Sequence, residues 1–275
     1  MPWFQNRLGE QLWYEDAGQG HPLVFLHGWC MSSAVWRAQF EALAGSFRLI
    51  APDLRGHGLS RGVAGQFDFE RFAADLLDLI EFLDLAGVIL VGWSMGAQIA
   101  LQACLDLADK MAGLVLVSAT PCFTAREDYP FGLVPNEASG MRLKVQRSIV
   151  RALSGFQSRM FAEGELEDLT LAEQVSGLFN SIVPPDTAVA VATLDSLARA
   201  DMRPLLSEIR IQTLILNGDC DQICLPQASD YLAEHLESAR HKVLSGCGHA
   251  PFITRPEQFN NEIIKYAGSV YDCIA

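Results

Sequence analysis

A serine between two glycines, where an apolar run meets a helical stretch, constrains this chain more than any other feature. Residues 92–96 read Gly-Trp-Ser-Met-Gly, after the apolar run 88–91 and before the helical stretch 97–107. A serine on such a sharp turn from strand to helix has its Oγ pushed out above the edge of a sheet, and only glycine tolerates the close backbone contacts beside it. The alternative is that this pentapeptide occurs by chance in a surface loop, without catalytic meaning. The flanking strand and helix predict that Ser94 is a nucleophile.

A nucleophilic serine needs a base and an acid that orients the base, and the chain supplies both further on. The apolar run 212–216 ends in Asn-Gly-Asp-Cys-Asp, so Asp219 and Asp221 both follow a predicted strand. After the next apolar run, 242–244, His249 lies on a glycine-rich loop. The order serine, acid, histidine is that of the α/β-hydrolase fold. In this arrangement the serine attacks an acyl carbon, the histidine takes and returns the proton, and the acid fixes the imidazole tautomer and stabilises the imidazolium.

Five other histidines compete for the role of base. His27 and His57 lie in glycine-containing turns of the first part of the chain, and His21, His235 and His241 are expected at ordinary surface positions. None of the five lies on a loop after the strand that carries the acid. They are therefore weaker candidates.

The oxyanion hole is also predicted by position. One donor is the backbone N–H of the residue after the nucleophile, here Met95, at a helix N-terminus where the dipole favours negative charge. The second donor is expected in the loop after the apolar run 23–26, and we assign it to the N–H of Trp29. The ring of this tryptophan can also pack as a buried residue or wall an acyl pocket.

Length and composition suit one enzyme-sized domain. The chain has 275 residues and seven cysteines, and it has no apolar stretch long enough to span a membrane. Residues 1–5 do not resemble the start of a secretory signal, and Cys220 and Cys224 have no second Cys/His pair nearby. We therefore expect a cytoplasmic protein with no metal site and no cofactor. We also expect the protein to be a monomer.

Apolar runs alternate with amphipathic helical stretches along most of the chain, which predicts a doubly wound, mostly parallel α/β sheet. The runs are 23–26, 47–51, 88–91, 114–118, 213–216 and 242–244, and the helical stretches lie near 68–84, 95–107, 226–237 and 256–267. A hairpin of residues 3–8 and 10–15 is expected to add antiparallel edge strands. Residues 121–205 interrupt the alternation and are predicted to be entirely helical, a lid above the nucleophile. The core then comprises residues 1–120 and 206–275.

The predicted lid carries a local reversal of charge. The formal net charge is -13, yet residues 138–162 contain no acid and five basic residues, which are Arg142, Lys144, Arg147, Arg151 and Arg159. On a helical wheel Lys144, Arg147 and Arg151 fall within a narrow arc, and Leu143, Ile149, Val150 and Leu153 gather on another face. The basic face is expected to point to solvent and to steer an acidic macromolecule to the lid. Nucleic acid is a poor candidate because the overall field would repel it.

The chain resembles the pimeloyl-[acyl-carrier protein] methyl ester esterases of biotin synthesis, within the α/β-hydrolase superfamily. The resemblance covers nearly the whole chain. It rests on His27-Gly28-Trp29, the Gly92–Gly96 segment, Pro121-Cys122-Phe123-Thr124-Ala125-Arg126, Gln146-Arg147 with Arg151, and Gly248-His249-Ala250-Pro251-Phe252. The triad and the segment Asp53–Gly58 are common to the superfamily and indicate little about substrate. The Pro-Cys-Phe-x-Ala-Arg segment, Trp93 and the lid arginines discriminate better.

The resemblance implies hydrolysis of the methyl ester of a pimeloyl chain carried on acyl-carrier protein, which frees the ω-carboxylate. It favours Asp221 over Asp219 as the acid, and it implies docking of the acidic carrier on Arg147 and Arg151. Substrate-binding positions fall on Ala152 and Phe156, where the family has an aromatic and a polar residue. The acidic stretch 163–168 is expected to limit the basic surface.

Other functions remain open at this stage. A broad-specificity carboxylesterase or a carbon–carbon bond hydrolase would use the same triad, and a ligand-binding or scaffold module could share the fold without catalysis. An intact triad argues against the last of these. Haloalkane dehalogenases and epoxide hydrolases need a carboxylate nucleophile, and Ser94 excludes them.

Overall fold

The computed structural model describes residues 2–272, which form one eight-stranded sheet in the order β1-β2-β4-β3-β5-β6-β7-β8. The strands are β1 (Trp3–Gln5), β2 (Gln11–Ala17), β3 (Pro22–Leu26), β4 (Arg48–Pro52), β5 (Val88–Trp93), β6 (Met111–Val117), β7 (Thr213–Gly218) and β8 (Ala239–Leu244). β1 pairs with β2, and β2 with β4, in antiparallel fashion, and the strands from β4 to β8 are parallel. This confirms the predicted α/β-hydrolase architecture and its antiparallel edge hairpin.

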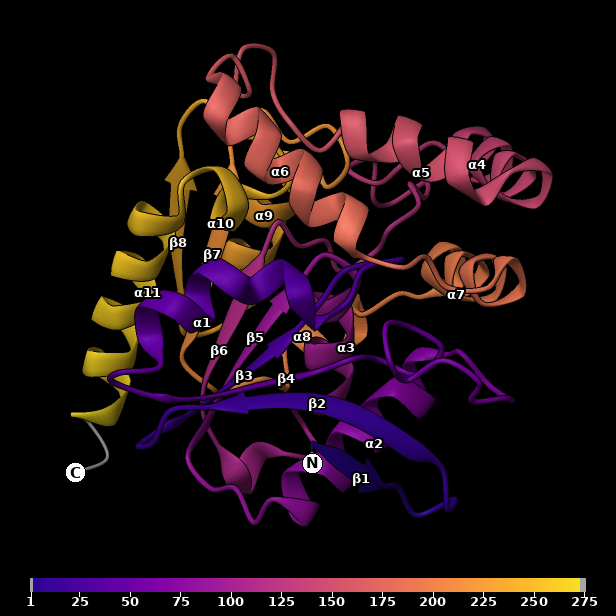
Figure 1. The fold of residues 1–275 in the computed structure, drawn as a ribbon. Coiled ribbons are helices and arrows are strands. Elements are labelled where there is room, and N and C mark those ends of the chain that lie inside the picture. The colour runs from indigo at the N-terminus through magenta and orange to yellow at the C-terminus, as the bar shows by residue number, and fades with distance from the viewer. Residues whose placement is uncertain (1, 273–275) are drawn as a thin grey trace.

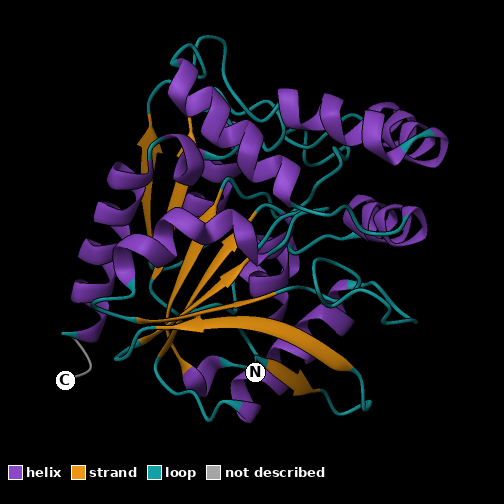
Figure 2. Ribbon diagram, viewed as in Figure 1, coloured by secondary structure: helices purple, strands orange, loops and turns teal. Residues whose placement is uncertain are grey.

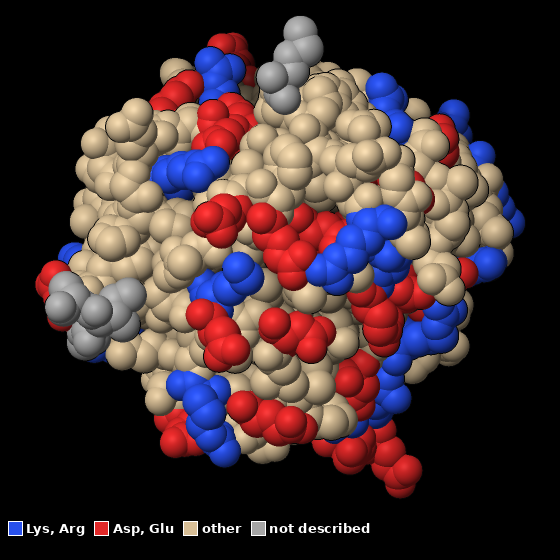
Figure 3. Space-filling view, turned by 90° about the horizontal axis from the view of Figure 1, so that it is seen from below, with Lys and Arg blue, Asp and Glu red and all other residues tan. Residues whose placement is uncertain are grey.

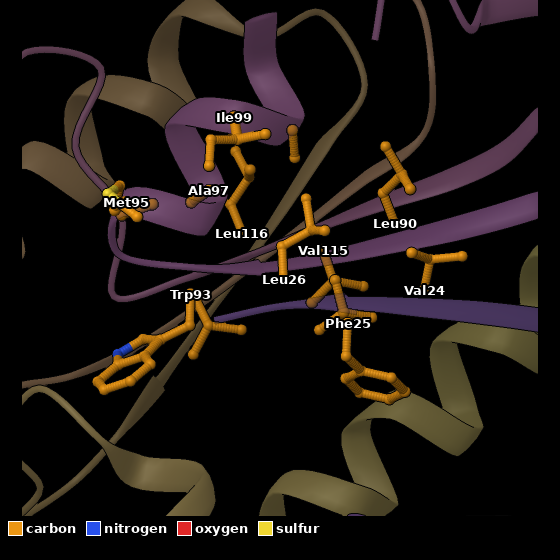
Figure 4. Close-up of a cluster of buried hydrophobic side chains, with 14 of the residues drawn as sticks. Val24, Phe25, Leu26, Leu90, Trp93, Met95, Ala97, Ile99, Val115 and Leu116 are labelled. Atoms are coloured by element: carbon orange, nitrogen blue, oxygen red, sulfur yellow. The ribbon is translucent and has the colours of Figure 1, made fainter. Parts of the chain in front are cut away.

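The central strands are apolar throughout because helices cover both faces of the sheet. Every residue of β3 and β5 is buried, as expected for interior parallel strands. Side chains alternate between the faces, so Phe25 points away from the side on which Ala97 and Ile99 pack (Figure 4). The hydrophobic core thus lies on both faces of the sheet.

Helices form the outer layers, as Figure 2 shows. α1 (Arg37–Leu43) packs with α11 (Pro256–Tyr271), and α2 (Phe69–Phe82) and α8 (Arg203–Leu206) pack with α3 (Met95–Ala103). The remaining elements of the core are η1 (Ser33–Trp36), η2 (Ala108–Lys110), α9 (Pro226–His235) and α10 (Pro251–Thr254). Among residues 2–272, no helix is both long and apolar enough to cross a membrane.

Of the helices between β6 and β7 in the chain, the first four gather on one side of the molecule (Figure 1). They are α4 (Pro135–Arg147), α5 (Ile149–Ser158), α6 (Leu169–Ser181) and α7 (Thr187–Arg199). The prediction that residues 121–205 are entirely helical is wrong for residues 121–134. This segment contains two isolated bridges, Thr124 with Leu133 and Arg126 with Tyr129. In the first bridge, Ala125 N–H donates to Leu133 O (2.8 Å) and Leu133 N–H to Phe123 O (2.7 Å). Its backbone groups therefore pair across a loop and not along a helix.

The Pro-Cys-Phe-Thr-Ala-Arg segment ties the beginning of this insert to its end. Arg126 donates from Nε to the Cys122 thiol (3.1 Å) and from Nη2 to Arg199 O (2.8 Å). Thr124 Oγ1 donates to Ala198 O (2.8 Å), and Met202 N–H to the carbonyl of residue 121 (2.8 Å). The segment closes the base of the helical insert.

A break at Ser148 separates α4 from α5, so the single helical wheel drawn through residues 143–153 was wrong. The backbone of Ser148 is extended (φ −166°, ψ 100°), and its side chain accepts from Arg151 N–H as the N-cap of α5. Leu143 and Val150 are consequently 53% and 69% exposed, whereas Leu153 is buried. The apolar residues that were predicted to share one helical face therefore lie on two helices, and only some of them are buried.

The opposite side of the molecule, seen in Figure 3, carries acidic side chains interspersed with basic ones. Beneath this surface Arg55, only 1% exposed, donates to Asp75 (2.6 Å) and to Glu10 (2.5 Å). Asp53 accepts from the N–H groups of Ser33 (2.8 Å) and Leu59 (2.7 Å). The segment 53–58 thus joins β4 to the edge hairpin and to α2, which is a structural role.

Candidate active site

Ser94 lies on the turn between β5 and α3, with strained backbone angles of φ 55° and ψ −115°. Its N–H donates to Val117 O at the end of the neighbouring strand (3.0 Å). A Cβ at Gly92 would collide with the backbone of Gly96, and a Cβ at Gly96 with the carbonyl of Leu26. Neither glycine has a positive φ, so both are required by close approach of α3 to the sheet and not by their own dihedral angles.

Asp221 and His249 form a fully buried pair. Asp221 Oδ2 lies 2.8 Å from His249 Nδ1, and both side chains are inaccessible to solvent. The other oxygen, Oδ1, accepts from the N–H groups of Ile223 (2.8 Å) and Cys224 (3.0 Å). A carboxylate only accepts, so Nδ1 of His249 carries a proton in this geometry. Among the described residues Nε2 of His249 has no partner, although it is buried.

The side chain of Asp219, the alternative acid, makes no hydrogen bond to His249. It accepts from Ser245 Oγ (2.9 Å) and from Gly246 N–H (2.7 Å), on the exposed outer side of the loop. Desolvation pushes the pKa of Asp219 upward, but hydrogen bonds from Ser245, Cys220 and Gly246 outweigh it and leave this pKa below its usual value. The structure brings Asp221, and not Asp219, to His249.

Two side chains connect the serine to the acid–histidine pair. Trp93, next to Ser94 in the chain, donates from Nε1 to His249 O (2.8 Å). The Cys224 thiol lies against Ser94; burial raises its pKa far above the usual value, the charge of Asp221 adds to this, and a hydrogen bond with the Ser94 side chain opposes it. Cys224 was not predicted as a neighbour of Ser94. Nothing in the local pattern indicated this contact, because it depends on how β5 and β7 lie in the sheet.

The two residues predicted as oxyanion donors lie at the start of α3 and in the loop after β3. Met95 is the first residue of α3 and is buried. The ring of Trp29 is anchored to α7, since its Nε1 donates to Ala190 O and Thr193 Oγ1 (both 3.1 Å). Phe156 meets this ring edge-on at 5.3 Å. The Trp29 loop is therefore held directly against the helical insert.

The other histidines lie in different settings. Burial lowers the pKa of His27 to about 4 and that of His57 to about 3, so both stay neutral within the core. His21 and His235 are exposed, as predicted. The surface position predicted for His241 is wrong, because this side chain is half-buried with Nε2 2.6 Å from Asn217 Oδ1.

The basic residues of the insert divide into two groups. Arg142 pairs with Asp195 of α7 (2.9 Å), and Arg159 donates to Gln222 O (3.2 Å). Lys144, Arg147 and Arg151 are exposed on α4 and α5, and we call these three the lid basic surface. The second group makes no ion pair among the described residues, so these three charges are available to a partner.

Comparison with known proteins agrees with the fold. Residues 21–256 match the family described as alpha/beta hydrolase fold, and the chain belongs to that family. A pimeloyl-[acyl-carrier protein] methyl ester esterase of Nitrosomonas europaea is 33% identical over 245 residues, which cover 89% of this chain and 95% of the relative. One from Nitrosospira multiformis is 29% identical over 93% of this chain and 98% of the relative. The chain belongs to the family of pimeloyl-[acyl-carrier protein] methyl ester esterases.

Among solved structures, an esterase from Exiguobacterium antarcticum superimposes with a TM-score of 0.90. It is 29% identical in sequence, and the match covers 97% of this chain and 98% of that one. The fold of that esterase is therefore shared over nearly the whole of this chain.

Proposed function

We propose that this protein is a serine esterase that hydrolyses the methyl ester of a pimeloyl chain carried on acyl-carrier protein, with Ser94, His249 and Asp221 as its catalytic triad. The observation that carries the proposal is the buried pair of Asp221 and His249. Nε2 of this histidine has no hydrogen-bond partner among the described residues, and its backbone carbonyl accepts from Trp93, the residue before Ser94. The names of the relatives support the substrate.

The reaction follows from this arrangement. Ser94 Oγ attacks the ester carbonyl carbon while His249 Nε2 takes its proton, and the tetrahedral oxyanion accepts from the N–H groups of Met95 and Trp29. Each donor contributes about 3 kcal/mol to stabilising the transition state. His249 then returns the proton to the departing methanol oxygen, and a water molecule cleaves the acyl-enzyme by the same steps. Asp221 holds the imidazole in the required tautomer.

In this proposal the insert 121–205 is a lid that shapes the acyl pocket. Phe156 contacts the ring of Trp29, and Ala152 lies one turn earlier on α5, also half-buried. An aromatic and a small apolar residue one turn apart suit a hydrocarbon chain. Ala152, Phe156 and the Trp29 ring would wall this chain, while the methyl ester reaches Ser94.

The lid basic surface would dock the carrier. Arg147 and Arg151 are exposed, on a chain whose formal net charge is -13, so this patch attracts an acidic partner that the rest of the molecule repels. Charges at a docking rim act mainly through the association rate and are screened by salt.

The test compares a carrier-bound methyl ester with a short neutral aryl ester. Arg147→Glu/Arg151→Glu should raise KM for the carrier substrate steeply and leave the aryl ester nearly unchanged. The control Arg240→Glu/Lys242→Glu changes the net charge equally at two exposed positions of β8 and should leave both substrates unaffected. The wild-type preference for the carrier substrate should shrink as the Debye length falls to ~8 Å or less. Equal losses on both substrates would mean that the arginines only support the lid.

A broad-specificity carboxylesterase is the second candidate, favoured by the likeness to the Exiguobacterium antarcticum esterase. It predicts similar kcat/KM for the two esters and no dependence of their ratio on salt. The cytoplasmic location and the monomeric state stay predictions of the sequence.

A further inference from the structure

A buried carboxylate in the lid holds the loop that carries His249. Glu165 lies between α5 and α6 and is 6% exposed. Its Oε2 accepts from Gly248 N–H (2.8 Å) and from Ala162 N–H (2.7 Å), and its Oε1 accepts from Thr254 Oγ1 (2.5 Å). The sequence analysis placed Glu165 in an acidic surface stretch, and this was wrong for Glu165 because its carboxylate is turned inward. The carboxylate joins the lid to the histidine loop at Gly248 and to the last residue of α10, the helix that follows this loop.

A second contact reinforces this connection. Met160 O, five residues before Glu165, accepts from His249 N–H (2.6 Å). A Cβ at Gly248 would collide with this same carbonyl, so the lid backbone presses directly on the loop. Two consecutive N–H groups, those of Gly248 and His249, thus donate to the lid segment and not to the core.

The loop that carries Asp221 also contacts this part of the lid. Arg159, at the C-terminal end of α5, donates to the carbonyl of Gln222, which follows Asp221 directly. Residues 159–165 therefore touch the loops of both the acid and the histidine. The carboxylate of Asp221 orients only the imidazole ring, whereas these lid contacts fix the backbone from which the ring projects.

We propose that Glu165 is a positioning residue for His249, through which the lid holds the catalytic base in place. The inference rests on the proposed role of His249. The loop contains Gly246, with a φ of +67°, and Gly248, and glycine leaves a backbone more conformational freedom than other residues do, so an external anchor restricts it. Glu165 supplies the anchor by accepting three hydrogen bonds, two of them from backbone N–H groups. Charge-assisted hydrogen bonds to a buried carboxylate are the strong kind.

The inference also joins carrier docking to catalysis. α5 carries Arg151 of the lid basic surface and leads through Arg159 and Met160 to Glu165. A carrier that binds α5 would contact the helix that leads directly into residues 159–165, which hold the loop of His249. Residues that dock the carrier and residues that hold the base would then lie on one continuous segment of the lid.

The experiment measures kcat and KM for the short aryl ester, with the fraction of active sites titrated by a fluorophosphonate. Glu165→Ala should lower kcat per titrated site by roughly 10- to 100-fold, since a shift of about 1 Å in a catalytic group costs this much, and should change KM by less than about threefold. Glu165→Gln should recover most of kcat, because its amide oxygen still accepts from both N–H groups and its NH2 donates to Thr254. Glu163→Gln is the matched control at an exposed neighbouring position and should equal wild type.

Three results would overturn the proposal. One is an unchanged kcat for Glu165→Ala. Another is a loss of titratable sites with normal kcat per site, which would show a purely structural role. The third is damage by Glu165→Gln equal to that by Glu165→Ala, since the hydrogen bonds would then not be the cause.

Three further variants keep the test decisive. If Glu165→Ala does not fold, Thr254→Val removes a single donor to the carboxylate and should still lower kcat per site several-fold; an unchanged value would overturn the inference. Activity in Ser94→Ala or His249→Ala would instead refute the triad itself, so the two failures are distinguishable.

Discussion

Exchange of the acid for its amide tests the site most sharply. In Asp221→Asn, the amide oxygen must stay on the N–H groups of Ile223 and Cys224, because an NH2 there would face two donors. The NH2 group then points at His249 Nδ1, 2.8 Å away. Nδ1 must become an acceptor, and the proton moves to Nε2. The imidazole is left in the tautomer that cannot accept the proton of Ser94.

The expected loss follows from this tautomer. An amide in place of the triad acid lowers kcat about 10⁴-fold in serine hydrolases while the geometry stays intact, equivalent to roughly 5 kcal/mol of transition-state stabilisation. Asp219→Asn is the matched control two residues away, because its amide oxygen can keep the bond to Gly246 and its NH2 can donate to Ser245 Oγ. We expect its kcat to stay within about threefold of wild type, in line with a change at an outward-facing loop position.

The assay is steady-state hydrolysis of a short aryl ester from pH 6 to 9, with circular dichroism to confirm folding and a fluorophosphonate to titrate Ser94. A larger loss in Asp219→Asn than in Asp221→Asn would refute the assignment of the acid. Near-normal turnover in Asp221→Asn would refute the tautomer argument.

Three further outcomes are expected. Ser94→Ala and His249→Ala should each lower kcat by several orders of magnitude, and the double variant should be little worse than either, because triad members act as a unit; additive losses measured by ester hydrolysis would contradict this. Gly96→Ala should destabilise the fold by on the order of 3 kcal/mol in urea unfolding, since its methyl group meets the carbonyl of Leu26, and an unchanged midpoint would count against the close approach of α3. Stability should fall as pH drops from 6.5 toward 4, because there the unfolded chain protonates two histidines that the folded core keeps neutral, each adding up to about 1.4 kcal/mol per pH unit. His57→Asn should remove about half of that slope, and a slope equal to wild type would show that His57 is not the group responsible.

The sequence alone was sufficient for the fold and for the strand–turn–helix position of Ser94. Both depend on local order: a strand, a tight turn and a helix contiguous in the chain place Ser94, and alternation of apolar runs with amphipathic stretches predicts the parallel sheet. Close approach of α3 to the sheet explains why glycine flanks the serine on both sides. The local pattern failed where a polar side chain competes with the helix, since the N-cap Ser148 divides α4 from α5.

Only the tertiary structure decided how distant segments meet. Asp219 and Asp221 are equivalent in the local pattern, and the loops after β7 and β8 determine that one faces His249 and the other faces solvent. Glu165 looked like one acid in a surface run, yet it accepts from Gly248, 83 residues further along the chain. Such a contact leaves no periodicity in the sequence, because its partners are brought together by packing of the lid against the strand ends and not by spacing along the chain.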